Sequence, residues 1–121
     1  MLFLLLACSS EIQVTPGQSA CVDVDFQNPD PSTLEWESTG EGAARVWRTY
    51  VFLDQSGLGF TPDLAIEKGV LTVNERWEEP ETDDAFCYQP ELEITDFRGV
   101  LEVRWFTEDD DTVPFATVQL E

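Results

Sequence analysis

The residues of this chain that could do chemistry are its carboxylates and its cysteines. Among 121 residues, 25 are Asp or Glu, three are Cys and none is His. The lack of an imidazole excludes Ser-His-Asp and Cys-His nucleophile systems, and also zinc or haem sites with a histidine ligand. Cys8, Cys21 and Cys87 lack the short spacing of cysteine metal ligands. Carboxylates are therefore the remaining catalytic candidates.

Two carboxylates held at a suitable distance are enough for glycoside hydrolysis, so an acid-pair hydrolase is one functional hypothesis. With 25 acids in the chain, such pairs arise by chance. No acid stands in a sequence context whose burial would raise its pKa. We therefore expect no catalytic residue and no enzymatic activity, and this hypothesis ranks third.

Clustered acids are also candidates for binding calcium, which takes roughly six to eight oxygen ligands. Asp109, Asp110 and Asp111 stand together in a predicted hairpin loop, and residues 81–84 form a second acidic group. Neither group has the pattern of an EF-hand loop. Adjacent aspartates are also typical of a charged turn, and the two interpretations remain open.

Four tryptophans in a domain of this size suggest carbohydrate binding, because exposed indoles stack on sugar rings. Trp47 and Trp105 lie in apolar segments and are predicted to be buried, with Trp47 the candidate for the central core tryptophan. Trp36 and Trp77 lie between acids near predicted loops, which predicts exposed rings and makes them candidate binding residues. The alternative is that these two cap the ends of the fold.

The charge of the chain is strongly negative, with a formal net charge of −19 and only six basic residues. Such a surface repels nucleic acid and anionic lipid headgroups, so no nucleic-acid partner is expected. A solvated acidic coat explains the charge, and a cation site or a basic partner are the alternatives. The 42% hydrophobic content is too high for a disordered chain, and the length indicates a single domain with its own core.

Period-two patterns dominate the sequence after residue 10, whereas helical periodicity is scarce. Strands are predicted at 12–14, 20–27, 44–54, 69–77, 85–89, 91–95, 99–106 and 113–121. A turn is predicted at Pro16–Gly17 and a long loop at residues 28–43. Frequent turn signals between short strands predict an all-β fold over residues 11–121, an antiparallel β-sandwich of about seven to nine strands.

The segment VTPGQSACVDVDFQNPDP resembles the start of immunoglobulin-like domains that are common in bacterial surface proteins. The order of Cys21, Trp36 and Cys87 also resembles the Cys…Trp…Cys framework of antibody-type domains. Cys21 shares its face with acidic residues, however, and Ala85 stands where that framework has a tyrosine. The resemblance therefore implies an immunoglobulin-like sandwich rather than a true antibody-type domain.

The opening residues MLFLLLACSS resemble the signal of bacterial lipoproteins. Leu5-Leu6-Ala7-Cys8 matches the lipobox, in which an apolar run and a small residue precede a cysteine. The resemblance implies that residues 1–7 are a signal-peptide remnant, that Cys8 carries a lipid, and that residues 8–10 are a tether. The alternative is an apolar first strand in the core. The resemblance implies an exported protein of the bacterial cell envelope, a periplasmic or outer-membrane lipoprotein.

If Cys8 carries a lipid, Cys21 and Cys87 remain as a pair in an exported protein, where a disulfide persists. The alternative is two buried free thiols. We expect the disulfide on the outer face of one sheet, between neighbouring strands or near a strand end.

Taken together, these patterns predict an envelope-anchored lipoprotein that acts as a structural or protein-binding module. Recognition is expected in the loops at 28–43 and 75–84. A carbohydrate- or calcium-binding sandwich is the alternative, and the expected partner is an envelope protein or a glycan.

Overall fold

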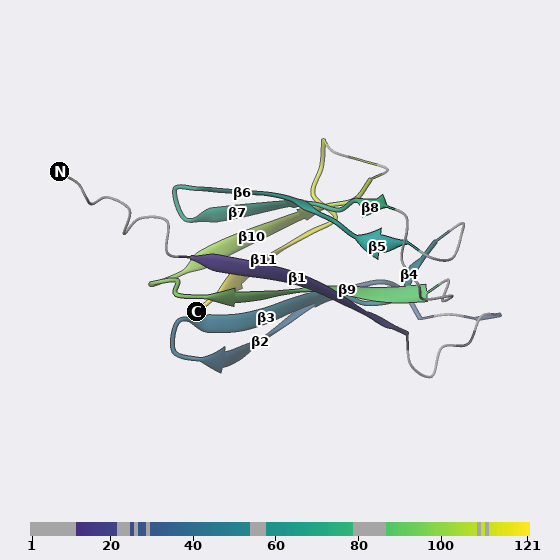
Figure 1. Cartoon of the computed structure of the whole chain (residues 1–121), viewed down its shortest axis with the longest axis horizontal. Helices are drawn as coiled ribbons and strands as arrows, with labels where there is room; N and C mark the ends of the chain where they lie inside the picture. Colours follow the sequence, from purple (N-terminus) through teal and green to yellow (C-terminus); the bar gives the residue numbers. More distant parts are fainter. Residues whose placement is uncertain are drawn as a thin grey trace.

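The chain folds as two β-sheets packed face to face, with a two-stranded sheet at one end, in a computed structural model (Figure 1). The structure describes residues 12–21, 25, 27–28, 30–53, 58–78, 87–108, 110 and 112–121. These residues form eleven strands. None of them belongs to a helix that could cross a membrane. The predicted all-β sandwich is confirmed, and the strand count exceeds the prediction partly because three strands are only two residues long.

The first sheet has the order β1-β9-β3-β2, with β4 also paired to β9. Its strands are β1 (Gln13–Ala20), β2 (Leu34–Gly40), β3 (Ala43–Arg48), β4 (Val51–Phe52) and β9 (Cys87–Thr95). All its pairs are antiparallel, and β9 is the strand on which the sheet is built.

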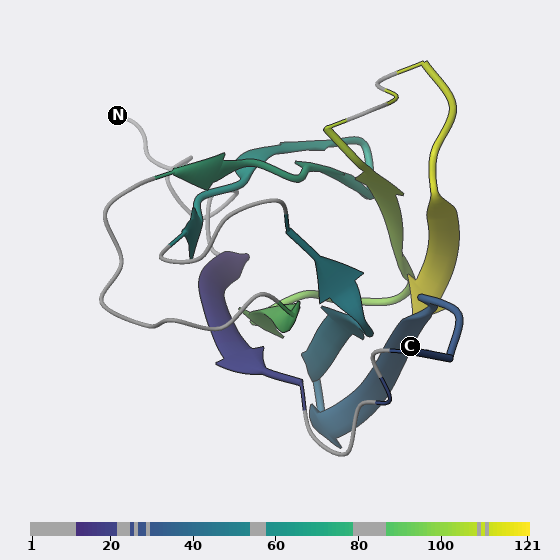
Figure 2. The same ribbon diagram turned by 90° about the vertical axis from the view of Figure 1, so that its right-hand side faces the viewer.

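The second sheet has the order β11-β10-β7-β6. It faces the first sheet, as the view along the strands shows (Figure 2). Its strands are β6 (Asp63–Glu67), β7 (Val70–Asn74), β10 (Leu101–Phe106) and β11 (Ala116–Leu120). The pair β7–β10 is parallel, which the antiparallel prediction did not include. The short strands β5 (Gly59–Phe60) and β8 (Trp77–Glu78) pair beside these layers.

The core lies between the two sheets and is built by alternate residues of facing strands, as the period-two patterns predict. The fully buried side chains include Val46, Leu71, Val73, Tyr88, Leu92, Ile94, Leu101, Val103, Trp105 and Leu120. Burying a side chain of this kind stabilises a fold by about 1.5 to 3 kcal/mol relative to leaving it exposed.

The predicted turn at Pro16–Gly17 is wrong, because β1 runs straight through it. The bond from Cys21 N to the Cys87 carbonyl fixes the phase of the β1–β9 ladder, so the nitrogen of Pro16 faces away from β9. At a sheet edge a proline in that position removes no ladder hydrogen bond. Half of the strand predicted at 20–27 lies outside the described residues, and Ala20, at the end of β1, is its one described residue in a strand.

The predicted long loop at 28–43 contains a strand instead, because β2 pairs with β3 along its length. Leu34 and Trp36 are half-buried against the core, while Glu35 and Glu37 are exposed. This is a period-two pattern whose flanking serine, threonine and glycine residues are typical of loops. Pairing with β3 outweighs that local preference.

The strand predicted at 44–54 is interrupted between β3 and β4. The pairs Trp47–Glu91 and Val51–Tyr88 are four residues apart on one strand and three on the other, which defines a one-residue bulge. Tyr50 adopts a φ of 49° within it. Pro90 of β9 lies opposite, where a missing N–H is tolerated because the neighbouring ladder is already broken.

Candidate functional site

Two opposite charges meet inside the sandwich, where Arg48 ends β3 and Glu75 follows β7. Val46 on β3 and Val73 on β7 point into the core. Arg48 and Glu75 each follow two residues later, so their side chains point inward as well. Glu75 is 4% exposed, and the Arg48 side chain is 15% exposed. Among the described residues, Glu75 is the one charged residue that is fully buried.

Each oxygen of the Glu75 carboxylate accepts two hydrogen bonds. Arg48 Nη1 donates to Oε1 at 2.8 Å and to Oε2 at 3.0 Å. Trp105 Nε1 donates to Oε1 at 2.9 Å, and Trp77 Nε1 donates to Oε2 at 3.0 Å. The buried charge is therefore both paired and hydrogen-bonded, as burial of a charge requires.

Aromatic rings surround this carboxylate and hold the two indoles in place. The ring of Phe60 stacks on Trp105 at 5.7 Å and tilts against Trp77 at 5.4 Å. Trp77 in turn lies 5.5 Å from Tyr88 of the facing sheet. These contacts tie both sheets and the short β5–β8 pair to the charged centre.

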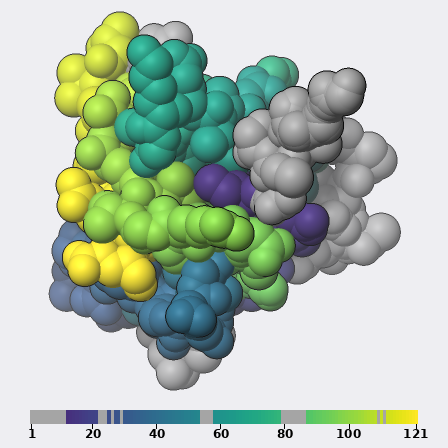
Figure 3. Space-filling model, turned by 90° about the vertical axis from the view of Figure 1, so that its left-hand side faces the viewer, coloured from purple at the N-terminus to yellow at the C-terminus, as the bar shows by residue number. Residues whose placement is uncertain are grey.

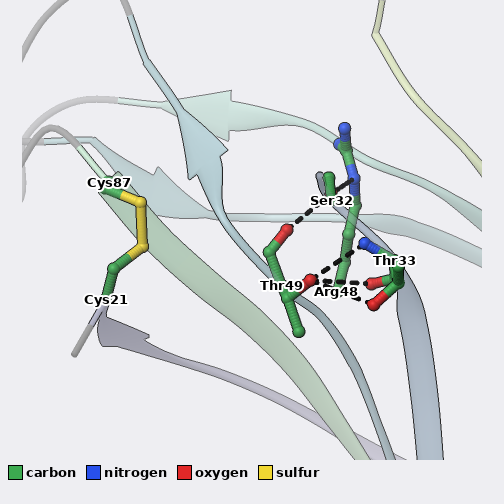
Figure 4. Close-up of a disulfide and its surroundings, with 6 residues drawn as sticks. All are labelled: Cys21, Ser32, Thr33, Arg48, Thr49 and Cys87. Atoms are coloured by element: carbon green, nitrogen blue, oxygen red, sulfur yellow. Dashed lines mark hydrogen bonds between the residues drawn. A yellow bond between two sulfur atoms is a disulfide. The ribbon is translucent and has the colours of Figure 1, made fainter. Parts of the chain in front are cut away.

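The guanidinium of Arg48 is also held from its other side. Its Nε donates to the Ser32 hydroxyl at 2.9 Å, and Ser32 donates to the Thr49 carbonyl at 2.5 Å (Figure 4). The ring of Phe115 lies 4.3 Å from the guanidinium carbon, a cation–π contact. Arg48 therefore links the buried carboxylate to the loop that precedes β11.

A cavity of about 510 Å³ opens beside Arg48 at this end of the sandwich, and we call it the end cavity. Its lining residues are Arg48, Val51, Phe52, Leu53, Leu58, Glu75, Trp77, Thr107, Glu108 and Phe115. Phe52 and Phe115 are 43% and 36% exposed. The volume is typical of small-molecule sites, which span roughly 300 to 1,000 Å³. The arrangement offers a ligand two aromatic walls beside a guanidinium that is held in place by its hydrogen bonds.

A second cavity of about 740 Å³ lies at the opposite end of the sandwich, between residues 41–42, 96–100 and Glu121. Tight turns shape it, since Asp96, Gly42 and Gly99 all have positive φ. A Cβ at Gly42 would lie 2.8 Å from the Phe97 carbonyl, so this approach requires glycine. No cluster of three potential metal ligands occurs there or elsewhere in the described residues.

No protein-family model, curated protein or solved structure matches the chain. The buried ion pair and the cavity beside it are therefore the observations on which a function rests.

The structure corrects the prediction for the tryptophans. Trp77 is 8% exposed because it follows Glu75 by two residues on the inward face, so its predicted exposure is wrong. Trp36 is half-buried against the core, and the two do not form an exposed aromatic face. Trp47 lies on the outer face of β3, with the Arg45 guanidinium 4.4 Å above its ring. The central core tryptophan is Trp105, which is fully buried.

The structure contains the predicted disulfide between Cys21 and Cys87 (Figure 4). Cys21 directly follows β1 and Cys87 begins β9, so the bond joins neighbouring strands at their ends. It is more enclosed than a bond on an outer sheet face would be, since Cys87 is 3% exposed and pairs with Phe52 on its other side.

Several predicted site residues lie outside the described part of the chain. These are Cys8 with the rest of residues 1–11, the acidic group at 81–84, and Asp109 and Asp111. Asp110 is described, and its carboxylate accepts hydrogen bonds from the Thr112 hydroxyl at 2.6 Å and the Thr112 N–H at 2.9 Å. Asp110 thus closes a turn, which is the alternative to a metal ligand.

The hydrogen bonds in the turn at Asp110 predict how the stability of this turn depends on pH. The hydrogen bond from the Thr112 hydroxyl lowers the pKa of the Asp110 carboxyl below its ordinary value of 3.8, and the backbone N–H groups of Thr112 and Val113 lower it further. Because the folded pKa is the lower one, the turn is stabilised above about pH 4, and this contribution is lost as the pH falls through the folded pKa. Thr112→Val is expected to raise the pKa of Asp110, measured by NMR titration of its carboxyl carbon.

A matched control is Thr117→Val, at an exposed position on β11. It removes a hydroxyl of the same kind and should leave the Asp110 titration unchanged. Equal Asp110 pKa values in the wild type and in Thr112→Val would contradict the assigned cause.

Proposed function

We propose that this chain is a lipid-anchored binding module of the bacterial cell envelope, with recognition at the end cavity. The observation that carries the proposal is a preformed cavity with exposed aromatic walls, Phe52 and Phe115, beside a fixed guanidinium. Concave sites of this size that combine aromatic walls with a few oriented polar groups are typical ligand sites. Exposed apolar side chains gathered at such a place also favour binding.

The contacts of Glu75 support binding rather than catalysis. A general acid or a nucleophile needs a carboxylate oxygen that can reach the substrate. Both Glu75 oxygens are already occupied, by Arg48 and by the two indole N–H groups. This carboxylate is suited to holding the site in shape.

The lipid anchor and the location outside the cytoplasm are part of the same proposal. Leu5-Leu6-Ala7-Cys8 resembles a lipobox, and the disulfide between Cys21 and Cys87 favours an oxidising compartment. A sandwich stiffened by this bond and held at a membrane would present its loops to an envelope partner. The carbohydrate alternative loses its support, because it depended on exposed rings at Trp36 and Trp77.

The proposal predicts two linked results in intact bacterial cells. A palmitate analogue should label the wild type, and Cys8→Ser should abolish both the label and fractionation with membranes. A photo-crosslinking residue at position 115 should form a defined adduct in the wild type and lose it in Cys8→Ser, because the anchor sets which partners are within reach.

Two matched controls accompany this experiment. Ser10→Ala changes a residue next to the lipobox and should keep both label and fractionation. The same crosslinker at Gln119, an exposed position on β11 away from the end cavity, should give no adduct of that size. Labelled, membrane-bound Cys8→Ser would overturn the anchor, and identical adducts from positions 115 and 119 would overturn the binding site.

A further inference from the structure

The strand β6 forms an edge of the second sheet, along the upper border of the molecule in Figure 1. Among the described strands, β7 is its one partner. Asp63, Ala65, Ile66 and Glu67 of β6 are all exposed. Viewed from the end where β6 turns into β7, the teal atoms of this hairpin occupy the upper rim of the surface (Figure 3).

The hydrogen-bond phase shows which backbone groups of β6 face outward. Thr61 N donates to the Arg76 carbonyl at 2.8 Å, and the pair Ala65–Thr72 continues the same antiparallel register four residues along. Hydrogen-bonded pairs recur at every second residue of such a ladder. The N–H and C=O of Leu64 and Ile66 therefore point away from β7, toward the open edge.

The edges of β1, β2 and β11 are protected in the described part of the chain. The edge of β1 carries Pro16, and the amide of Gln18 accepts from Phe60 N at 2.6 Å and donates to the Leu58 carbonyl at 3.2 Å. Through these two bonds the side chain of Gln18 joins the edge of β1 to β5 and the residue before it. Strands β2 and β11 pack against each other where the two sheets meet. Pro62 directly precedes β6 and Lys68 directly follows it, so proline and charge protect the two ends of this edge, and the outward backbone groups of Leu64 and Ile66 lie open between them.

The charges on β6 determine which strand could pair with it. Leu64 packs against the core, so Asp63, Ala65 and Glu67 face outward by alternation. Two copies paired antiparallel about Ala65 would place Asp63 of one opposite Glu67 of the other, twice, between chains of net charge −19. Like charges in opposite positions destabilise a strand pair, so self-association is disfavoured.

A basic strand has the opposite property. Asp63 is paired with Arg76 at 3.0 Å, which leaves Glu67 as the outward carboxylate without an ion pair in the described structure. Lys or Arg at alternate positions of an added strand would face this carboxylate on the outer side. The apolar positions between them would lie beside Leu64 and beside Ile66, whose side chain is 42% exposed.

We propose that the free edge of β6 is the docking site for an extended, basic segment of a partner protein, which adds as a strand to the β11-β10-β7-β6 sheet. Main-chain hydrogen bonds to Leu64 and Ile66 give the affinity, and the charge at Glu67 selects the partner. This surface lies apart from the end cavity and depends on neither the cavity nor the lipid anchor.

The probe for this site is a fluorescent seven-residue peptide of alternating Lys and Val, with binding measured by fluorescence anisotropy. Ile66→Pro removes one outward N–H but no ladder bond to β7, and should weaken binding at least about tenfold. Ile66→Val, the matched control, should bind within about twofold of the wild type. Glu67→Lys, a surface change that preserves the fold, should weaken binding as well.

Peptide variants separate strand addition from simple charge attraction. N-methylation of the alternate residues whose N–H groups face β6 should abolish binding, whereas methylation of the other set should not. A Glu-Val peptide of the same length should not bind. Equal binding of both methylated peptides, or unchanged binding to Ile66→Pro and Glu67→Lys, would overturn the proposal. So would a wild-type dimer in sedimentation that Ile66→Pro dissociates, because it would make a second copy the occupant.

Discussion

Replacing Cys21 and Cys87 together by serine is expected to lower the free energy of unfolding by about 4 kcal/mol, from the entropy of the loop that the disulfide closes. The bond joins residues 66 apart, and its loss lets the unfolded chain expand. It also places hydroxyls where Cys87 is buried, at the start of the strand on which the first sheet is built. Urea unfolding of the variant and of the oxidised wild type measures the difference.

Two controls show that the disulfide itself is responsible. Ser19→Ala changes an exposed residue two positions from Cys21 and should alter stability by less than about 0.5 kcal/mol. The wild type unfolded in the presence of a reductant should lose the roughly 4 kcal/mol that the bond contributes, and the Cys21→Ser/Cys87→Ser variant should be less stable still because of its buried hydroxyls. If the double variant is as stable as the oxidised wild type, the bond has no stabilising role.

The second large effect is expected at the buried ion pair. Glu75→Leu leaves the Arg48 charge and two indole N–H groups without their acceptor inside the core, and should cost about 3 to 5 kcal/mol. Adding Arg48→Met in the same chain should recover part of this loss, because the uncompensated charge is removed. Chemical denaturation of both single variants and the double variant gives the coupling energy.

The matched control for this cycle is Glu93→Leu, which changes an exposed glutamate on β9. It should alter stability by less than about 1 kcal/mol. A Glu75→Leu variant as stable as Glu93→Leu, or a double variant that is the sum of the two singles, would show that the pair does not act as a unit.

Much of the architecture follows from local alternation. The patterns at 91–95 and 99–106 became parts of β9 and β10, with the expected residues buried. Alternation cannot show where a strand tolerates a proline or a bulge, however. Pro16 is tolerated because it faces the open edge of the sheet, and Pro90 because it lies opposite the bulge at Tyr50. Only the assembled sheet contains this information.

The inward position of both charged residues could have been predicted from the sequence, if the alternation rule had been applied to charged residues as well as to apolar ones. Val46 is followed two positions later by Arg48, and Val73 by Glu75, so both charges occupy inward positions. Trp77 continues the second series, which is why it is buried and not exposed. That the two series meet depends on the packing of one sheet on the other, and the exposed walls of the end cavity depend on it too.

The pairing of β1 has a consequence for how the protein comes into being. Its partner β9 lies far along the chain, since Ala20 pairs with Tyr88 and Gln13 with Thr95. A chain that emerges N-terminus first from a ribosome or a translocation pore therefore carries an unmatched first strand until most of the domain has followed. Folding dominated by such distant pairings is slow and exposes intermediates to aggregation. Early oxidation of Cys21 with Cys87 would shorten that interval, because it fixes β9 beside β1 as soon as both strands have emerged.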